Sequence, residues 1–306
     1  MLKLDEKKIR KGKAIGLPYQ GSKKKISKKI VEIIKQNFGT DKPIYDVFGG
    51  GGAITAECII NGLEVYYNDL DKDITDAFER VVSQNREWIK TLIVSRDEFY
   101  EIKGKENKTT DDFLKLLVNS FGNNKKDYLY SKENSDLKYN LAKEIIKNHD
   151  VFSGYKQTET YKKAISSTYW DWFNEKEEKH KILQQLGRLQ QLEQLGRLQQ
   201  LERFQQINEV KATNKSYYDF SEVSGAVLYL DPPYENSYQD SYINLFNSKE
   251  FYNWAFEMAK KNIVIISSYS ILDERFEEVY SFDKARSTLQ GGQSGKHEKL
   301  FMVKSS

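Results

Sequence analysis

The sequence contains very little cysteine and histidine. Its 306 residues include one cysteine and three histidines. A single cysteine cannot form a disulfide within the chain, which is typical of a reducing compartment such as the cytoplasm. A zinc site would need several thiolates or imidazoles close together. We therefore expect a cytoplasmic protein without a metal site, in which Cys58 is a buried core thiol.

Long apolar runs and a large net charge are also missing. The sequence holds no run of roughly 18 apolar residues that could span a membrane, and its charged start, MLKLDEKKIRKGK, does not resemble a secretory signal. The net charge is only +3, so overall charge does not identify a nucleic-acid ligand. Basic residues gather at 7–13 and 23–29. Each run suits either phosphate binding or a solvated helix face.

The pattern over residues 43–85 predicts alternating strands and helices. Just before it, apolar residues at helical spacing predict a helix over 26–38. The elements that follow are a strand at 44–48, glycines at 49–52, a helix at 53–60, a strand at 63–69 ending in Asp69, and a helix at 73–85. This order is the opening of a doubly wound α/β sheet of the Rossmann-like type.

The alternation lapses after residue 88 and returns after residue 210. AVLYL at 226–230 predicts a buried strand, and a helix and two more strands follow it. Because a structureless loop of such length is implausible inside a domain, we expect a mainly helical inserted domain at 89–210. Residues 1–88 and 211–306 would then form one α/β domain that is split in the sequence.

A nine-residue repeat lies within the predicted insertion. LGRLQQLE occurs at 186–193 and again at 195–202, with an apolar residue at every third position. Because an α-helix turns about 100° per residue, such a stripe drifts around the helix, and Gly187 and Gly196 weaken helix formation further. We expect a helical or partly helical segment. It is either a spacer without chemistry or a surface for DNA or another partner.

The glycines at 49–52 lie in a position typical of ligand binding. DVFGGGG at 46–52 follows a predicted strand and opens a helix, and glycines let a ligand approach the backbone closely. Asp69 ends the next strand, where such folds place an acid for ribose hydroxyls. A structural tight turn is the alternative. The spacing lacks the pyrophosphate pattern, which mildly favours a cofactor without phosphates, but it does not choose between a dinucleotide and S-adenosylmethionine.

The tetrapeptide DPPY at 231–234 directly follows the strand AVLYL. An exocyclic aryl amine is a poor nucleophile, and two acceptors on its hydrogens would free its lone pair. The Asp231 carboxylate and the Pro232 carbonyl can be these acceptors, held by a turn that two prolines stiffen. The Tyr234 ring can stack on a base that has left the duplex. The alternative is a proline-rich turn with a chance tyrosine. The predicted catalytic residues are Asp231, Pro232, Pro233 and Tyr234.

Five motifs in this order resemble the Dam-type DNA adenine-N6 methyltransferases, particularly those of phages. They are PYQGSK at 18–23, DVFGGGG at 46–52, YYNDLD at 66–71, DPPY at 231–234 and the tail RSTLQGGQSGKHEKLF at 286–301. SYYDF at 216–220 is similar to the stretch that borders the cofactor adenine in that family. Ser22 departs from the family, which often has glycine there.

The resemblance implies in-line methyl transfer from S-adenosyl-L-methionine to adenine N6 in double-stranded DNA. It implies an enzyme of a bacterial host cell with no metal and no membrane partner. Whether the enzyme is an orphan, is borne by a phage or is paired with a restriction enzyme stays open, and such a partner is not required. The cofactor-binding residues it implies are Tyr19, Gly21, Lys23, Asp46, Phe48, Gly49, Gly51, Asp69, Asp219, Phe220 and Asp231. For Lys23, a contact with a DNA phosphate is the alternative. An RNA adenine or amide N-methyltransferase, or a non-catalytic DNA-binding relative, remains open as an alternative function.

Target recognition is expected in the insertion, which only loosely resembles the recognition hairpin of that family. Residues 119–140 combine Asn, Lys, Ser and Tyr around a turn, and asparagine and lysine can read base edges or hold phosphates. The alternative is an ordinary solvated polar loop. The predicted DNA-binding residues are Asn123, Asn124, Lys125 and Lys126.

Overall fold

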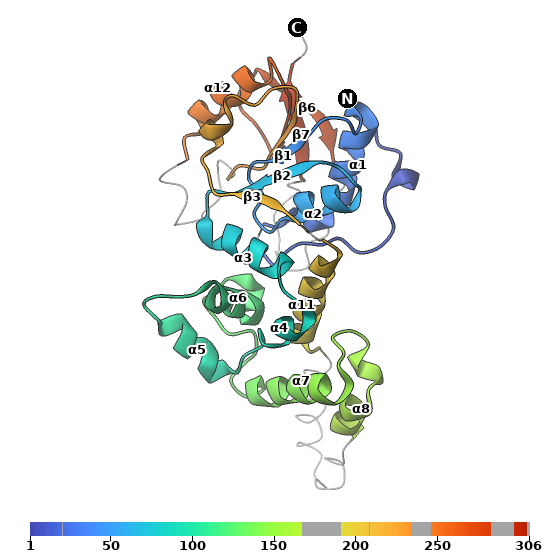
Figure 1. Cartoon of the computed structure of the whole chain (residues 1–306), viewed down its shortest axis with the longest axis vertical. Helices are drawn as coiled ribbons and strands as arrows, with labels where there is room; N and C mark the ends of the chain where they lie inside the picture. Colours follow the sequence, from blue (N-terminus) through green and yellow to red (C-terminus); the bar gives the residue numbers. More distant parts are fainter. Residues whose placement is uncertain (20, 167–190, 208, 234–245, 283–296, 305–306) are drawn as a thin grey trace. The chain divides into compact units, whose positions relative to one another are not determined.

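The computed structural model describes residues 1–19, 21–166, 191–207, 209–233, 246–282 and 297–304 (Figure 1). The chain forms two compact units. The first unit contains Met1–Ile15, Ser22–Thr75 and Glu209–Ser306, and the second contains Gly16–Gly21 and Asp76–Asn208. The first unit is therefore assembled from segments that lie on both sides of the second in the sequence.

A seven-stranded sheet forms the centre of the first unit. Its strands are β1 (Ile44–Asp46), β2 (Val65–Asn68), β3 (Lys211–Thr213), β4 (Val227–Leu230), β5 (Ile263–Ser268), β6 (Phe276–Ser281) and β7 (Lys299–Val303). Their order is β3-β2-β1-β4-β5-β7-β6, with β1 to β5 parallel and β7 antiparallel to both of its neighbours. The chain order reverses between β1 and β4, which is where doubly wound sheets bind ligands beyond the carboxyl ends of their strands.

Helices cover both faces of this sheet (Figure 1). One face packs in a single apolar cluster with α1 (Ser27–Phe38) and α2 (Ala53–Ile60), and the other with α12 (Ser248–Met258). Strand β4 shows the division, because Val227 and Tyr229 belong to the first cluster and Leu228 and Leu230 to the second. All positions of β4 are buried, as expected for a central strand covered on both sides.

The strands predicted from the apolar runs are confirmed as β1, β2, β4, β5 and β7. The predicted helices at 26–38, 53–60 and 73–85 correspond to α1, α2 and α3 (Lys72–Val82). Strands β3 and β6 escaped the sequence reasoning. Both lie at the edges of the sheet and read KAT and FEEVYS, and an edge strand needs little of the apolar pattern that marks a buried one.

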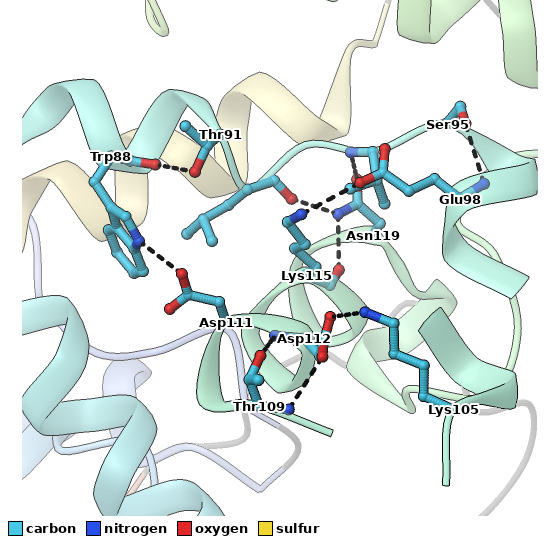
Figure 2. Close-up of polar contacts among 12 residues, drawn as sticks. Trp88, Thr91, Ser95, Glu98, Lys105, Thr109, Asp111, Asp112, Lys115 and Asn119 are labelled. Atoms are coloured by element: carbon cyan, nitrogen blue, oxygen red, sulfur yellow. Dashed lines mark hydrogen bonds and ion pairs between the residues drawn. The ribbon is translucent and has the colours of Figure 1, made fainter. Parts of the chain in front are cut away.

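The second unit is helical in the part that the structure describes (Figure 1). Its helices are α4 (Arg86–Lys90), α5 (Arg96–Gly104), α6 (Thr110–Asn119), α7 (Ser135–His149), α8 (Glu159–Ser166) and α11 (Glu193–Glu202). Figure 2 shows how α6 begins and how it is held: Thr109 and Asp112 form a capping box, and Asp111 accepts a hydrogen bond from the indole nitrogen of Trp88 in α4 (3.2 Å). Such caps satisfy the orphan N–H groups of a helix start.

Helix α11 contains the second copy of the leucine repeat. Leu195, Leu198 and Leu201 are fully buried, as is Phe204 in the single 3-10 turn that follows the helix. The drift of the apolar stripe is tolerated because α11 contacts α4, α6 and α7, so that more than one of its sides faces the interior. The second copy is therefore a core helix rather than a spacer. Most of the first copy lies outside the described residues.

Candidate active site

Three aspartates lie at the carboxyl ends of neighbouring parallel strands in the first unit. Asp46 is the last residue of β1, Asp69 follows β2 and Asp231 follows β4. Burial is the main cause that raises their pKa values, to about 7 for Asp46 and about 6 for both Asp69 and Asp231. The pKa of Asp46 is also raised by the charges of the other two. This edge of the sheet therefore concentrates buried negative charge, which favours a cationic ligand.

Lys23 is the cation of this group. Its Nζ lies 2.7 Å from both carboxylate oxygens of Asp231 and 3.7 Å from Oε1 of Glu298. The three side chains are 9%, 16% and 13% exposed, respectively. Burial by itself would lower the pKa of Lys23, but the charges of Asp231 and Glu298 outweigh it, so the pKa is raised. The predicted lysine and the predicted catalytic acid are thus an ion pair.

The glycine loop between β1 and α2 is fastened to the end of β2. The N–H of Gly49 donates to the carbonyl of Asn68 (2.7 Å), and the N–H of Gly50 donates to Oδ2 of Asp69 (2.8 Å). A Cβ at position 49 would lie 2.3 Å from the ring of Tyr67, so only glycine fits there. Gly51 is buried in the same loop.

Asp46 binds the start of α2. Its Oδ2 accepts hydrogen bonds from the backbone N–H (3.1 Å) and the hydroxyl (2.7 Å) of Thr55, and its side chain is buried. The carboxylate therefore joins the end of β1 to the first turn of the following helix, and it is positioned before any ligand arrives.

The predicted adenine-side residues lie around a short 3-10 helix at Tyr217–Phe220. Asp219 caps this helix by accepting from the N–H of Ser216 (2.9 Å), and Phe220 is buried with its ring 5.9 Å from that of Tyr45. The ring of Phe48 packs against the rings of Tyr217 (6.1 Å) and Phe251 (5.7 Å), which also contact each other. In this structure Asp219 holds the helix start and Phe220 anchors the helix in the core.

The remaining predicted residues are distributed as follows. Pro232 is buried and Pro233 half-buried at the end of β4, whereas Tyr234 lies outside the described residues. Tyr19 and Gly21 belong to the second unit, as do the predicted DNA-binding residues Asn123, Asn124, Lys125 and Lys126.

Sequence reasoning missed three polar residues of the first unit. Asn68 is buried and donates to the carbonyls of Val47 and Lys215 (both 2.9 Å). Ser267, at the end of β5, donates to Oε1 of Glu298 (2.8 Å), just before β7. Ser267 could have been found, because it is a polar residue at the end of the apolar run NIVIISS. Glu298, in KHEKLF, is marked in the sequence only as a charge before a strand.

These observations define a Rossmann-like methyltransferase fold with an acidic site at the switch point of its sheet. The family model of the D12 class N6 adenine-specific DNA methyltransferases matches residues 19–284. The match covers most of the chain, and the chain belongs to this family. It is therefore an enzyme that methylates adenine N6 in DNA with S-adenosylmethionine as methyl donor. No curated protein matches the sequence.

The chemistry of the side chains fits this cofactor. S-adenosylmethionine carries a sulfonium and an amino group, which suit carboxylates, and a carboxylate, which suits an ammonium. Asp46, Asp69 and Asp231 are the carboxylates that suit the positive groups of the cofactor, and Lys23 is the ammonium that suits its carboxylate. Among the described residues no group of three or more His, Cys, Asp and Glu side chains could hold a metal ion. None of the described helices is long and apolar enough to cross a membrane.

Proposed function

We propose that the enzyme acts on double-stranded DNA at a specific sequence, and that the target adenine leaves the duplex to react in the DPPY site. The observation that carries this is the position of Asp231, Pro232 and Pro233 at the end of buried β4, next to the sheet's reversal point. A base inside a duplex cannot present its N6 to such a site, so the base must be taken out of the stack.

Asp231 and Pro232 are proposed to activate the adenine amine. The carboxylate of Asp231 and the carbonyl of Pro232 each accept a hydrogen bond from N6, which directs the nitrogen lone pair toward the methyl group. Because the pKa of Asp231 is about 6, this carboxylate is mostly ionised at neutral pH. The cofactor, when bound, supplies a methyl group that its positive sulfur already activates. Pro232 and Pro233 limit the movement that the turn can make, so the acceptors are oriented in advance.

We propose that the cofactor is bound by residues that supply carboxylate acceptors, such as Asp69, and by the ammonium of Lys23. Asp69 accepts from the N–H groups of Gly50 (2.8 Å) and Asp71 (2.9 Å), one on each carboxylate oxygen. Each oxygen has two lone pairs, so Asp69 can still receive ribose hydroxyls. For Lys23, the burial of its side chain and its bond to Asp231 support a role at this site over a contact with DNA phosphate. Roles for Tyr19, Gly21, Phe48, Asp219 and Phe220 remain part of the same proposal.

Recognition of the target sequence is proposed for the insertion, specifically for the loop at 121–127. Ser120 and Tyr128 pair as an antiparallel bridge that closes this loop, and Phe121 at its start is 60% exposed. Asn123 and Lys125 have positive φ angles of 58° and 60°. The Oδ1 of Asn123 is buried without a hydrogen-bond partner among the described residues. A strained turn with an unsatisfied amide oxygen is a feature that a bound ligand can explain.

The predicted segment 119–140 is not a single loop. Asn119 ends α6, Tyr128 and Tyr130 are buried, and α7 begins at Ser135. The segment contains two exposed turns, one between Ser120 and Tyr128 and one at 131–133, and the four predicted residues all lie in the first. We therefore place DNA reading in residues 121–127, which include the four residues predicted from the sequence.

The experiment that tests the proposed function is modification-sensitive sequencing of DNA from a host that expresses the chain. N6-methyladenine at one recurring sequence, read from both strands of the duplex, is the expected result. Transfer of tritium from labelled cofactor to duplex DNA, single-stranded DNA, RNA and protein, measured side by side, tests the choice of substrate. Label that enters RNA or protein faster than duplex DNA would overturn the proposal.

A further inference from the structure

Glu298 adds a second carboxylate to the ion pair of Lys23 and Asp231. We propose that Glu298, held by Ser267, is a positioning residue for methyl transfer that takes over the Lys23 ammonium when the adenine amine binds to Asp231. The inference rests on the role proposed above for Asp231. It concerns residues of the first unit only, from the segment before α1 and from the ends of β4, β5 and β7.

The geometry places one ammonium between two carboxylates at unequal distances. Lys23 Nζ lies 2.7 Å from each oxygen of Asp231 but 3.7 Å from Oε1 of Glu298. An N–H···O hydrogen bond has a length of about 2.9 Å. The present arrangement therefore gives the hydrogen bonds to Asp231 and leaves Glu298 as an ion-pair partner, which a movement on the order of 1 Å would convert to a hydrogen bond.

Glu298 is held in place by the sheet. Its Oε1 accepts a hydrogen bond from the hydroxyl of Ser267 (2.8 Å), and Ser267 is fully buried in β5. Ser267 pairs directly with Leu300 of β7, two residues after Glu298. The carboxylate is thus fixed by two hydrogen-bonded strands, and Lys23, with a long side chain, is the group that can move.

Methyl transfer makes this movement useful. Lys23 lies 2.7 Å from both oxygens of Asp231, so an amine that donates to this carboxylate competes with the ammonium for its lone pairs and its negative charge. A buried ammonium is destabilised when its hydrogen bonds to an acceptor are weakened, and Glu298 offsets this by accepting a hydrogen bond from it. No proton is transferred and no bond is formed or broken in this step, which changes only hydrogen-bond partners.

The charges around Asp231 determine the direction in which its pKa should change when one of them is removed. Burial is the largest cause of the raised pKa of Asp231. The charge of Lys23 lowers this pKa, and the charges of Glu298 and Asp69 raise it. Asp46, Tyr229 and Tyr269 also face this carboxyl group and couple to it electrostatically. Removing the charge of Glu298 should lower the pKa of Asp231 from about 6, while removing that of Lys23 should raise it.

The test uses Glu298→Gln in the full-length enzyme. The carboxyl carbon of Asp231 is titrated by NMR in the protein without cofactor, assigned by its loss in Asp231→Asn. Single-turnover methyl transfer is then measured at pH 8, where Asp231 is ionised in every form. We expect the Asp231 titration to move to lower pH and the transfer rate to fall by about tenfold. The affinity for S-adenosylhomocysteine and the unfolding midpoint should stay at wild-type values. Glu298→Asp should recover part of the rate.

Glu278→Gln is the matched control, because Glu278 pairs with Lys299 (2.6 Å) near β7 but not with Lys23. It should leave both the titration and the rate unchanged. Wild-type transfer in Glu298→Gln would overturn the proposal, as would a rate loss that is accompanied by equal losses of cofactor affinity and stability. If Asp231→Ala keeps its activity, the role of Asp231 fails by that result, whereas the titration in Glu298→Gln reports on the cluster separately.

Discussion

The guanidinium of Arg197 donates hydrogen bonds to the carbonyl oxygens of Ser120 (2.7 Å) and Val118 (2.6 Å). Both carbonyls lie at the C-terminal end of α6, where helix carbonyls lack partners within the helix. Ser120 also begins the loop proposed to read DNA. A residue of the leucine repeat therefore fixes the base of that loop, and Gln194 of the same repeat donates to Oδ1 of Asn119 beside it (2.6 Å).

The first prediction is that Arg197→Met lowers both stability and sequence discrimination. Loss of buried hydrogen bonds from a charged group costs about 2 to 3 kcal/mol of unfolding free energy, measurable by urea denaturation. The loop should then adopt several conformations, so methylation should spread to sequences that differ from the target, as measured by modification-sensitive sequencing. Cofactor affinity should not change.

Two matched variants test whether support of the loop comes from Arg197 itself or from the repeat as a whole. Arg188→Met makes the same substitution in the first copy, and an equal loss in both variants would contradict a specific role for Arg197. Deletion of 185–193 removes one copy and leaves QLGRLQQLE intact. We expect that deletion to preserve the target sequence, because the remaining copy can supply the buried glutamine, arginine and leucines of α11.

A second prediction concerns Asp231→Ala. Removal of a positioned acceptor at the reacting amine should lower the single-turnover rate by at least about 100-fold. The fold should persist, because Lys23 keeps Glu298 as an ion partner. The measurements are methyl transfer, circular dichroism and cofactor binding by calorimetry. Activity within tenfold of wild type, with unchanged cofactor affinity, would exclude the proposed role.

Asp69→Asn should weaken cofactor binding more than it disturbs the fold. The amide keeps the shape of the side chain but loses the negative charge and one of the two oxygen acceptors. In Asp69 these oxygens accept from the N–H of Gly50 (2.8 Å) and would accept from ribose hydroxyls. We expect the affinity for S-adenosylmethionine to fall by about tenfold in calorimetry. Glu64→Gln is the control, because Glu64 is exposed beside β2 and should leave the affinity unchanged. Equal affinity in the two variants would remove Asp69 from the cofactor site.

The raised pKa values of the aspartates predict how stability changes with pH. Because the folded-state pKa values of Asp46 (about 7), Asp69 (about 6) and Asp231 (about 6) exceed the ordinary value of 3.8, these three groups bind more protons in the folded protein than in the unfolded chain between about pH 4 and 7. These groups therefore make the unfolding free energy fall as the pH rises through that window.

A cationic ligand should offset this loss. The increase in melting temperature caused by S-adenosylmethionine should grow between pH 5 and pH 8, since its sulfonium meets more ionised carboxylates. S-adenosylhomocysteine has no sulfonium charge and should show a smaller change over the same range. Differential scanning fluorimetry with both ligands measures this, and identical pH trends for the two would count against a sulfonium held by these acids.

The last prediction divides the DNA-reading loop into supporting and contacting residues. Asn124 accepts from the N–H groups of Lys126 (2.8 Å) and Asp127 (3.1 Å), and the ammonium of Lys125 lies 4.2 Å from the centre of the Phe113 ring. These two side chains support the turn. Asn123 and Lys126 are therefore the better candidates for contact, and Asn123→Ala with Lys126→Ala should change the methylated sequence or lower DNA affinity while the fold stays intact.

The comparison for that variant is Lys132→Ala, an exposed lysine outside the loop. It removes the same charge as Lys126→Ala and should reduce DNA affinity much less. If the double variant methylates the same sites at the wild-type rate, recognition belongs to another part of the insertion. Replacement of all four residues from Asn123 to Lys126 should, in addition, lower the melting temperature, because it removes the support of the turn.

The sequence alone determined the order of the central elements and the position of the DPPY motif. Strand and helix periodicity, glycine and proline are local signals, so β1, α2, β2 and β4 could be predicted from short windows. The same signals placed Asp46, Asp69 and Asp231 at strand ends. Their convergence followed only from a parallel sheet, in which strand ends meet at one edge.

Tertiary structure alone decided which distant residues join them. Glu298 reaches Lys23 and is bonded by Ser267 because β7 inserts antiparallel between β5 and β6, and no local pattern encodes that pairing. Likewise, the three-residue spacing of leucines does not favour a single helix face, and α11 became a core helix because several helices surround it. Its buried Arg197 and Gln194 look like surface residues in the sequence. Only the packing of α11 against α6 shows that they hold a loop.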